Sequence, residues 1–315
     1  MVFDYTLVCT TYNDSDSIIP FLKNIEKQTR LPSEVVIADG GSKDDTVKII
    51  KDYNDKSELK IKLVYGKRLN IAQGYNEAIK NTEAEVIAVA GVGNFYSTDF
   101  FEKLYSTMSE TGAEIVYSPI SGQENTAFQT AYNSIFLGGK NGLTFSCPSN
   151  HGSLVKKSVF EKMGLFYENF WYAGEDSEFY QRCQKAGIKI ALNNEARVFW
   201  DTPHTWKEFL RQREVYTVGG MQRLGYTLLR QSLTSFMKVF AVFFIILLAL
   251  FKLWILFGIS AILYAAYLIK AACTSTALSF LIKITTPFLS VYYILKNFRF
   301  MKTKYRVDLE KYPVK

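Results

Sequence analysis

The chain has 315 residues and a formal net charge of +7, with 37 Lys and Arg residues against 30 Asp and Glu residues. This length is sufficient for a large hydrophobic core and a second region. Positive charge suits nucleic acid, but residues 1–230 contain no compact run of Lys and Arg with interleaved aromatic residues, so we expect no nucleic-acid partner. The four cysteines lack the spacing of a zinc site, and we interpret them as reduced thiols of a cytosolic protein.

Two apolar segments in the first forty residues each run into a polar loop. They are predicted to be strands, with a helix over 20–28 between them, which is the pattern of a parallel sheet. Ligands bind at the carboxyl ends of the strands in such sheets. The alternative is a structural strand–helix–strand unit with a solvated acidic turn, since a fold alone does not determine a function. The two loops read Thr11-Tyr12-Asn13-Asp14 and Asp39-Gly40-Gly41-Ser42.

The alternation of strands and helices continues along the chain. The sequence predicts a helix that begins at Asp44, a strand over 59–64, a helix over 70–79, and a strand over 86–90 that ends in the loop Gly91-Val92-Gly93-Asn94. This order is typical of an α/β fold in which helices flank a mostly parallel, twisted sheet.

The composition changes abruptly at Phe236, where apolar residues become dominant. Apolar runs over 236–251 and 253–269, separated by Lys252, predict a hairpin of two transmembrane helices, each near the lower limit of about 17 to 25 residues. The stretch 278–300 is interrupted by Lys, Arg and Pro residues, and we interpret it as an amphipathic helix that lies in the membrane interface.

These features divide the chain into three regions. We expect residues 1–230 to form a cytosolic α/β domain, residues 231–271 to form two transmembrane helices, and residues 272–315 to form the interfacial helix and a basic tail. Lys and Arg prefer the cytosolic side of a membrane, and two spans return the tail to the side of the first domain. The predicted location is the cell membrane, as a multi-pass protein in contact with membrane lipids.

The order of several short segments resembles a family 2 glycosyltransferase of the GT-A fold, over about residues 4–225. The segments are TTYND, ADGGSKDDT, NIAQGYNEAI, VIAVAG, NHGSLVKKSVFEKMGLF and GEDSEFYQRCQKAG. The resemblance implies an inverting transfer from a nucleotide-sugar donor. Small membrane-attached members of this family act on lipid-linked acceptors, so a polyprenyl-phosphate-linked lipid or oligosaccharide is the expected acceptor.

The resemblance assigns the general base to the sequence Gly174-Glu175-Asp176. Asp176 matches the catalytic base of the family, and Glu175 matches its neighbour that faces the acceptor. Aromatic surroundings raise the pKa of a carboxyl group and a helix amino terminus lowers it. The alternative is an acidic helix cap. Glu178 is expected on the solvated face of the same helix.

The resemblance also assigns residues to the nucleotide. Asp39 matches the residue that accepts the ring N–H of uracil or guanine, and Gly40 allows close approach of the backbone to a ligand. Arg68 is a candidate phosphate contact. For Arg68, Asn70 and Gln73, a solvated loop and a helix cap are the alternative. The remaining candidates, which match the lining of the base and ribose or the helix over the nucleotide, are Thr11, Tyr12, Asn13, Asn70 and Gln73.

The sequence departs from the family at the diphosphate site. The fourth strand of the family usually ends in Asp-x-Asp, which holds a divalent metal, whereas both carboxylates are missing from Gly91-Val92-Gly93-Asn94. The amide oxygen of Asn94 is a poor ligand for Mg²⁺ or Mn²⁺. Three explanations stay open. The enzyme acts without metal, or His204 and Asn94 hold the metal, or the chain is a catalytically silent subunit that scaffolds a glycan-assembly complex.

Four further residues are candidate contacts of phosphate or acceptor. A lone His is more often structural than a ligand, and an Arg near a membrane is also expected to contact lipid headgroups. The positions of these residues resemble the acceptor loop of the family and the basic helix that closes its active site. They are His151, His204, Gln212 and Arg213.

Overall fold

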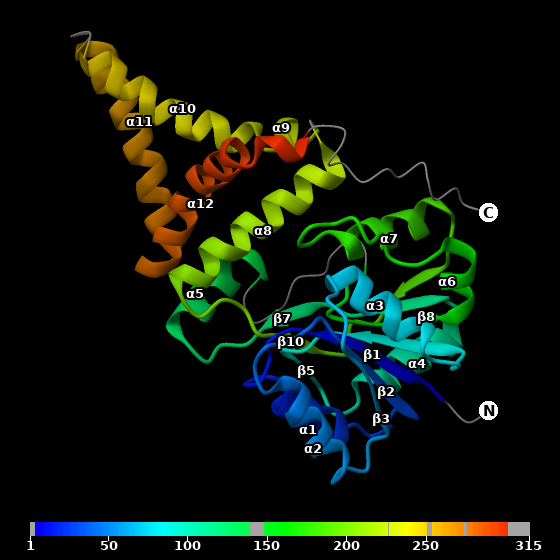
Figure 1. Ribbon diagram of the computed structural model, residues 1–315. Coiled ribbons are helices and arrows are strands. Elements are labelled where there is room, and N and C mark those ends of the chain that lie inside the picture. The colour runs from blue at the N-terminus through cyan, green and yellow to red at the C-terminus, as the bar shows by residue number, and fades with distance from the viewer. Residues whose placement is uncertain (1–3, 139–147, 226, 251–253, 274–275, 302–315) are drawn as a thin grey trace. The chain divides into compact units, whose positions relative to one another are not determined.

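The computed structural model describes residues 4–138, 148–225, 227–250, 254–273 and 276–301 (Figure 1). The chain forms two compact units. Among the described residues, the first contains residues 4–123 and 148–201, and the second contains residues 124–138 and the described residues from 202 to 301. Each unit is described by itself.

The first unit is built on a seven-stranded sheet. Its strand order is β3-β2-β1-β4-β8-β6-β9, and β3, β2, β1 and β4 are parallel to one another, as the sequence predicts. Strand β8 is antiparallel to both of its neighbours. The strands are β1 (Thr6–Thr11), β2 (Glu34–Asp39), β3 (Ile61–Val64), β4 (Val86–Ala90), β6 (Ile115–Tyr117), β8 (Gly152–Lys156) and β9 (Ile190–Leu192).

A small second sheet lies beside the end of β4. Its order is β5-β10-β7, with β5 (Asn94–Tyr96) antiparallel and β7 (Ile120–Gly122) parallel to β10 (Val198–Trp200). Trp200 pairs with Asn94 in this sheet. The residues that follow β4 are therefore held against a strand that is about one hundred positions away in the sequence.

Helices cover both faces of the main sheet (Figure 1). In β1, Leu7 and Cys9 point into one core and Val8 into the other, which explains why the strand is apolar throughout. The helices of the first face are α1 (Ile18–Glu26), α2 (Thr46–Asn54) and α4 (Phe100–Thr111), and those of the second are α3 (Ile71–Lys80), α6 (Lys157–Met163) and α7 (Glu175–Lys185). Cys9 and Cys183 are buried free thiols, as expected, and Cys147 lies outside the described residues.

One glycine explains how closely α3 packs on the sheet. A Cβ atom on Gly74 would lie only 2.1 Å from Oγ1 of Thr10, so any larger residue would push the helix away from β1. At the start of α3, the side chain of Asn70 accepts a hydrogen bond from the backbone of Gln73, and Gln73 accepts one from the backbone of Asn70. This capping box fixes the amino terminus of α3 at the carboxyl end of the sheet.

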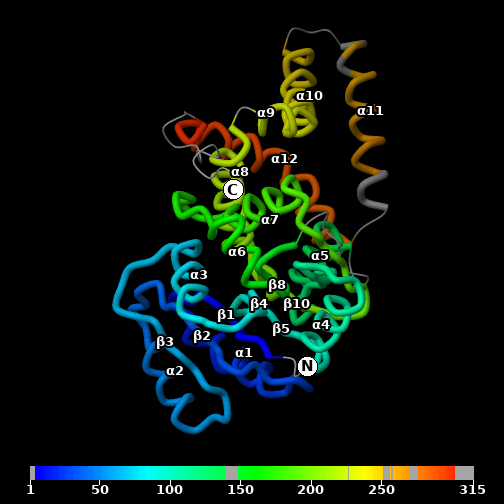
Figure 2. Tube along the Cα trace, turned by 90° about the vertical axis from the view of Figure 1, so that its right-hand side faces the viewer, coloured from blue at the N-terminus to red at the C-terminus, as the bar shows by residue number. Residues whose placement is uncertain are grey.

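The second unit is helical. Its elements are α5 (Ala127–Phe136), α8 (Trp206–Leu224), α9 (Thr227–Gln231), α10 (Leu233–Leu250), α11 (Trp254–Cys273), α12 (Ala277–Lys296) and the short 3₁₀ helix η2 (Phe298–Met301). Helix α12 packs against α5, α8 and α10, and α10 lies beside α11 (Figure 2). Helix α8 packs on α12 and belongs to this compact unit, and the predicted division of the chain into domains stays a prediction.

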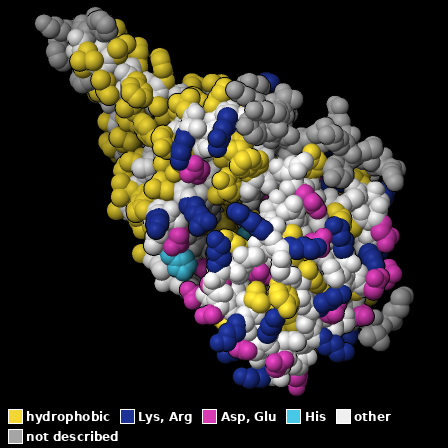
Figure 3. Space-filling model, in the orientation of Figure 1, with side chains coloured by type: hydrophobic (Ala, Val, Ile, Leu, Met, Phe, Trp, Pro, Cys, Tyr) yellow, Lys and Arg dark blue, Asp and Glu magenta, His cyan; other side chains and the backbone are white. Residues whose placement is uncertain are grey.

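Two helices, α10 and α12, are long and apolar enough to cross a membrane, judged by length and composition alone. Helix α10 corresponds to the first predicted span, and hydrophobic side chains gather over this part of the chain (Figure 3). The second predicted span lies in α11, whose described apolar part is the shorter stretch Gly258–Ile269. Helix α12 also has the length of a span, although we expected it in the interface. The number of spans therefore stays a prediction, and the basic tail lies outside the described residues.

Candidate active site

The carboxyl ends of β1 and β2 lie side by side, because Thr11 pairs with Asp39 in the sheet. Asp39 is only 2% exposed, and its carboxylate accepts hydrogen bonds from the backbone of Gly41 at 2.9 Å and of Ser42 at 3.0 Å, and from the Ser42 hydroxyl at 2.5 Å. A carboxylate offers about four acceptor positions. The turn therefore holds Asp39 rigidly and leaves room for one further donor, such as a ring N–H.

The loop after β1 is tied to the loop after β2. The Asn13 side chain accepts a hydrogen bond from Lys43 N at 2.8 Å, and Asn13 N donates to the Ser42 hydroxyl at 2.9 Å. Asp14 accepts from the Thr11 hydroxyl at 2.8 Å, and burial raises the pKa of the Asp14 carboxyl. Tyr12 is 52% exposed, which leaves its ring accessible for stacking on a flat base. Asn13 thus joins the two loops through these hydrogen bonds, and its contact with the ribose stays a prediction.

The loop before α3 packs on the glycines of the second loop. Leu69 N donates to Gly40 O at 3.3 Å, and a Cβ on Gly40 would lie 3.0 Å from Leu69 O. The exposed Arg68 belongs to the same loop, with its Cα 3.5 Å from the position of a Cβ on Gly41. The fold therefore brings Arg68 to the edge that carries Asp39, as the phosphate role requires.

Asn70 and Gln73 form the helix cap that the sequence analysis named as their alternative role. Besides the capping box, Asn70 Nδ2 donates to Glu168 O at 2.7 Å and so holds the loop that leads toward α7. Both side chains are occupied by these structural contacts. Their predicted nucleotide contact is not tested by the structure.

In the loop after β4, an amide lies beside an imidazole. Asn94 Nδ2 donates to Gly91 O at 3.0 Å, and Asn94 Oδ1 lies 3.0 Å from His151 Nδ1. The His151 ring packs on Trp200, with ring centres 4.7 Å apart. Burial lowers the pKa of His151 to about 4, against the opposing effect of the Asp176 carboxylate. His151 is therefore neutral at pH 7 and brings no positive charge to a diphosphate.

The described residues contain no group of three His, Cys, Asp or Glu residues that could hold a metal ion. One acidic residue, Asp201, lies near this loop. Asp201 N donates to Gly93 O at 3.0 Å, and a Cβ on Gly93 would lie 3.9 Å from the Cβ of Asp201. The sequence analysis missed Asp201, since only the pairing of β5 with β10 places it there.

The Glu-Asp pair begins α7, as predicted. Gly174 precedes it with a φ of 110°, a left-handed conformation that favours glycine. Glu175 is 6% exposed, and burial, with a further contribution from the Asp176 carboxylate, raises the pKa of Glu175 to about 8. At neutral pH the Glu175 carboxyl is protonated and can donate a hydrogen bond. Asp176 is half-buried, and its Oδ1 accepts from Ser177 N at 2.5 Å.

The expected position of Glu178 is wrong. This residue is buried rather than solvated, and it forms an ion pair with Arg182, with 2.9 Å between Glu178 Oε1 and Arg182 Nε. Arg182 Nη2 donates in turn to Leu165 O at 3.0 Å. The pair clamps α7 to the segment after α6, so this face of the helix is inside the protein.

Three buried polar residues next to His151 were missed by the sequence analysis. Tyr180 OH lies 2.8 Å from the Ser153 hydroxyl and 3.3 Å from Asn150 Oδ1. Asn150 Nδ2 is buried and has no hydrogen-bond partner among the residues that the structure describes. The only sequence signal was the position of Asn150 beside His151, because burial of the three depends on the packing of α7 against β8.

Three predicted residues belong to the second unit. His204 Nε2 lies 3.2 Å from Gln129 Nε2, and Gln212 Oε1 accepts hydrogen bonds from Tyr132 OH at 2.8 Å and from Arg213 Nη2 at 2.9 Å. Since His204 and Asn94 each bond a different neighbour, nothing in these contacts supports them as a joint metal site.

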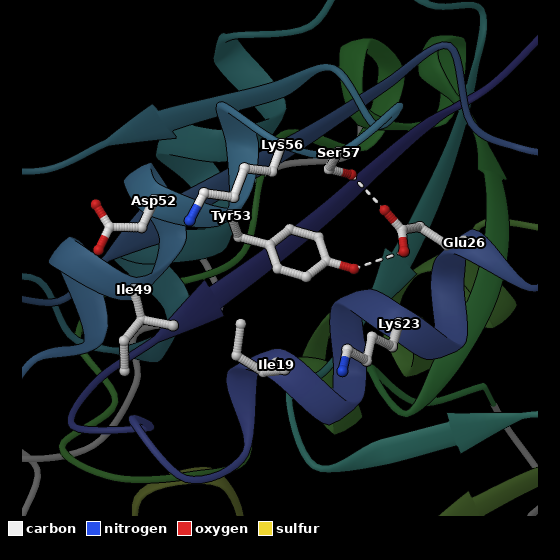
Figure 4. A pocket seen from close by; sticks show the side chains of 8 residues that line it. All are labelled: Ile19, Lys23, Glu26, Ile49, Asp52, Tyr53, Lys56 and Ser57. Carbon is white, nitrogen blue, oxygen red and sulfur yellow. Dashed lines mark hydrogen bonds between the residues drawn. The ribbon is translucent and has the colours of Figure 1, made fainter.

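A surface hollow of about 540 Å³ lies between α1 and α2, away from these residues (Figure 4). Two carboxylates line it, and one of them, Glu26, accepts hydrogen bonds from Tyr53 OH at 2.6 Å and from the Ser57 hydroxyl. None of the predicted site residues lines it, so we keep the candidate active site at the strand ends.

Comparison with known proteins identifies the family of the chain. Residues 6–164 match the sequence model described as Glycosyl transferase family 2, and residues 97–290 match that of Glycosyl transferase family group 2. A protein of Methanococcus voltae is 26% identical over 251 residues, which cover 70% of this chain and 74% of that protein. It is named dolichyl N-acetyl-alpha-D-glucosaminyl phosphate 3-beta-D-2,3-diacetamido-2,3-dideoxy-beta-D-glucuronosyltransferase.

Two solved structures show the likeness of the fold. The mannosyltransferase PcManGT from Pyrobaculum calidifontis, in complex with GDP-Man and Mn²⁺, has a TM-score of 0.60 at 16% identity, covering 94% of this chain and 88% of that chain. S. aureus TarS 1-349 in complex with UDP has a TM-score of 0.50 at 16% identity, covering 70% of this chain and 66% of that chain. The chain spans 40% of the longer TarS structure.

Proposed function

The chain belongs to glycosyl transferase family 2, and from this premise we propose that it transfers a sugar, with inversion, to an acceptor carried on a polyprenyl phosphate at the cytosolic face of the membrane. The fold is of the GT-A type, and the chain is a nucleotide-sugar-dependent glycosyltransferase. The lipid-linked acceptor is supported by the name of the Methanococcus voltae relative and by the two apolar helices.

The observation that carries the proposal is the Glu175-Asp176 pair at the start of α7. Asp176 takes the proton of the acceptor hydroxyl while the hydroxyl oxygen attacks the anomeric carbon. The bond from that carbon to the nucleotide diphosphate breaks on the opposite face of the sugar, which inverts the configuration. The protonated Glu175 donates a hydrogen bond to the acceptor and so orients it. The diphosphate leaves with its negative charge.

The donor is held at the strand ends. Asp39 accepts the ring N–H of the base, the Tyr12 ring stacks on that base, and Arg68 contacts the diphosphate. A divalent metal in other members of the fold would neutralise the diphosphate as a Lewis acid. Here the charge is met by cationic side chains and backbone N–H groups, because the carboxylates of Asp-x-Asp are replaced by glycines.

A donor and acceptor screen tests the function. The full chain in lipid nanodiscs is incubated with a panel of UDP- and GDP-sugars and with polyprenyl phosphates that carry zero, one or two sugars. Mass spectrometry detects the product, and NMR gives its anomeric configuration. We expect one donor to be transferred to a lipid-linked acceptor with inversion. Transfer to soluble glycans alone would contradict the proposal that the acceptor is lipid-linked.

The loss of Asp-x-Asp favours one alternative, a catalytically silent subunit. The same screen separates the two functions when nucleotide binding is measured in parallel by calorimetry. Nucleotide binding without transfer from any donor, with or without Mn²⁺, would favour the silent subunit.

The orientation in the membrane has its own test. Single cysteines at positions 30 and 304 are introduced into a cysteine-free chain and labelled in sealed vesicles with an impermeant reagent. Two spans place both positions on the cytosolic side. Labelling from opposite sides would require an odd number of spans.

A further inference from the structure

Arg213 of α8 lies among aromatic rings of the second unit. Its guanidinium carbon is 4.7 Å from the ring centre of Phe136, 5.6 Å from that of Phe209 and 5.4 Å from that of Tyr216. These distances are in the range of cation–π contacts. The rings therefore fix the guanidinium group in position without neutralising its charge.

Within the described residues, a single nitrogen of this guanidinium group, Nη2, donates its hydrogen bonds. Arg213 Nη2 donates to Gln212 Oε1 at 2.9 Å and to Tyr132 OH at 3.4 Å. Arg213 Nε is buried without a partner, and Nη1 donates to no group in the described part of the chain. A charged donor without an acceptor is unfavourable inside a protein, and a bound anion would remove this cost.

No carboxylate compensates the charge. Within the ranges that the structure describes, no carboxylate oxygen lies within 4.0 Å of the guanidinium nitrogens of Arg213. The adjacent Glu214 pairs instead with Lys296 Nζ at 2.9 Å and accepts a hydrogen bond from Asn297 Nδ2 at 3.3 Å. A permanently charged planar fork that is held in place but unpaired suits a phosphate group.

We propose that this arginine cage, made of Arg213, Gln212, Tyr132, Phe136, Phe209 and Tyr216, binds the phosphate of the acceptor lipid, a phosphate ester on a long hydrocarbon chain. The inference rests on the proposed function. Two features favour a lipid over a free phosphate. The walls of the cage are aromatic, and α5 and α8, which build it, both pack against the apolar helix α12. A hydrocarbon chain attached to the phosphate would therefore contact the apolar surface of these helices.

Binding of farnesyl phosphate to the full chain in detergent tests the cage, with inorganic phosphate, phosphatidylglycerol and UDP as comparison ligands. The variants are Arg213→Gln, Arg213→Lys and, as a matched control, Arg211→Gln, which removes the same charge from an exposed position on the same helix. We expect Arg213→Gln to weaken farnesyl phosphate binding by about tenfold or more, since charge-assisted bidentate hydrogen bonds are lost. Arg213→Lys keeps the charge without the fork and should weaken binding less.

The comparison ligands decide between the sources of phosphate. Unchanged UDP binding in all three variants, with farnesyl phosphate affected only at position 213, supports the lipid. Equal loss of farnesyl phosphate binding in Arg211→Gln and Arg213→Gln would overturn the proposal. So would unchanged farnesyl phosphate binding by Arg213→Gln, or a loss of binding that is confined to UDP or to inorganic phosphate. Arg213→Lys keeps the test valid when the Gln variant does not fold. The binding assay involves no sugar transfer. If the screen finds no donor that is transferred, the proposed function is refuted, while the binding result for the arginine cage stands.

Discussion

Asp39 and Glu175 are both buried residues of the candidate active site, yet their surroundings differ. Three donors of its own turn surround Asp39 and hold its charge in place. Glu175 lies at a helix start whose backbone N–H groups only partly offset burial, so its pKa rises to about 8. Burial alone therefore does not set the chemistry of a carboxyl group. Hydrogen-bond donors around a buried carboxyl group also shape its role.

The largest effect is expected at Asp176. Asp176→Asn removes the proton acceptor and should lower turnover by roughly 10²-fold or more, the scale of a positioned general base, while nucleotide affinity stays the same. Turnover is measured with the donor that the screen identifies, and affinity by calorimetry. Ser177→Ala is a matched control on the same turn, because the contact of Ser177 with Asp176 comes from its backbone. Turnover near that of the control would remove Asp176 from the mechanism.

The second prediction sharpens the binding role of Asp39. Asp39→Ala should weaken nucleotide binding by about 1.5 to 3 kcal/mol, because a buried ring N–H loses its charged acceptor. Ser42→Ala serves as the control, since it leaves the carboxylate and removes only the two hydrogen bonds of the Ser42 hydroxyl, one to Asp39 and one from Asn13 N. Equal losses of nucleotide affinity in both variants would show that Asp39 only shapes the turn.

The third prediction concerns the pH dependence of stability. The pKa of Glu175 is raised in the folded protein, so its contribution to stability is full below the unfolded pKa, near 4.5, and is lost as the pH rises through about 8. Glu175→Gln removes this dependence. One pKa unit corresponds to about 1.4 kcal/mol. Between pH 4 and pH 9, the free energy of unfolding of the wild type should therefore fall by about 2 kcal/mol or more relative to that of Glu175→Gln. Denaturant unfolding at both pH values measures it, and parallel curves would refute a raised pKa.

The smallest effect is expected for metal removal. Transfer should persist in excess EDTA, and Mg²⁺ or Mn²⁺ should stimulate it only weakly, because the Asp-x-Asp carboxylates are absent and Asn94 is occupied by Gly91 and His151. The measurement is initial rate with and without chelator. Loss of transfer on chelation with recovery in Mn²⁺ would contradict this and point to Asp201, which lies beside Gly93.

The errors of sequence reasoning have a common origin. Glu178 was expected on the solvated face of α7, but packing against the segment after α6 buries it with Arg182. Asp201 was overlooked because its neighbour Gly93 is distant in sequence. In each case the local pattern was read correctly, and the residue that decides the environment lies outside it.

The sequence by itself determined the order of parallel strands and helices, the loops at the ends of β1 and β2, and the Glu-Asp pair at a helix start. These depend on periodicity and on neighbours within a few residues. Only the tertiary structure decided that Asn94 bonds His151, 57 positions away, and that Tyr132 contacts Arg213, 81 positions away. Burial and hydrogen-bond partners depend on segments brought together by folding, and so do the pKa of a carboxyl group and the exposure of an arginine.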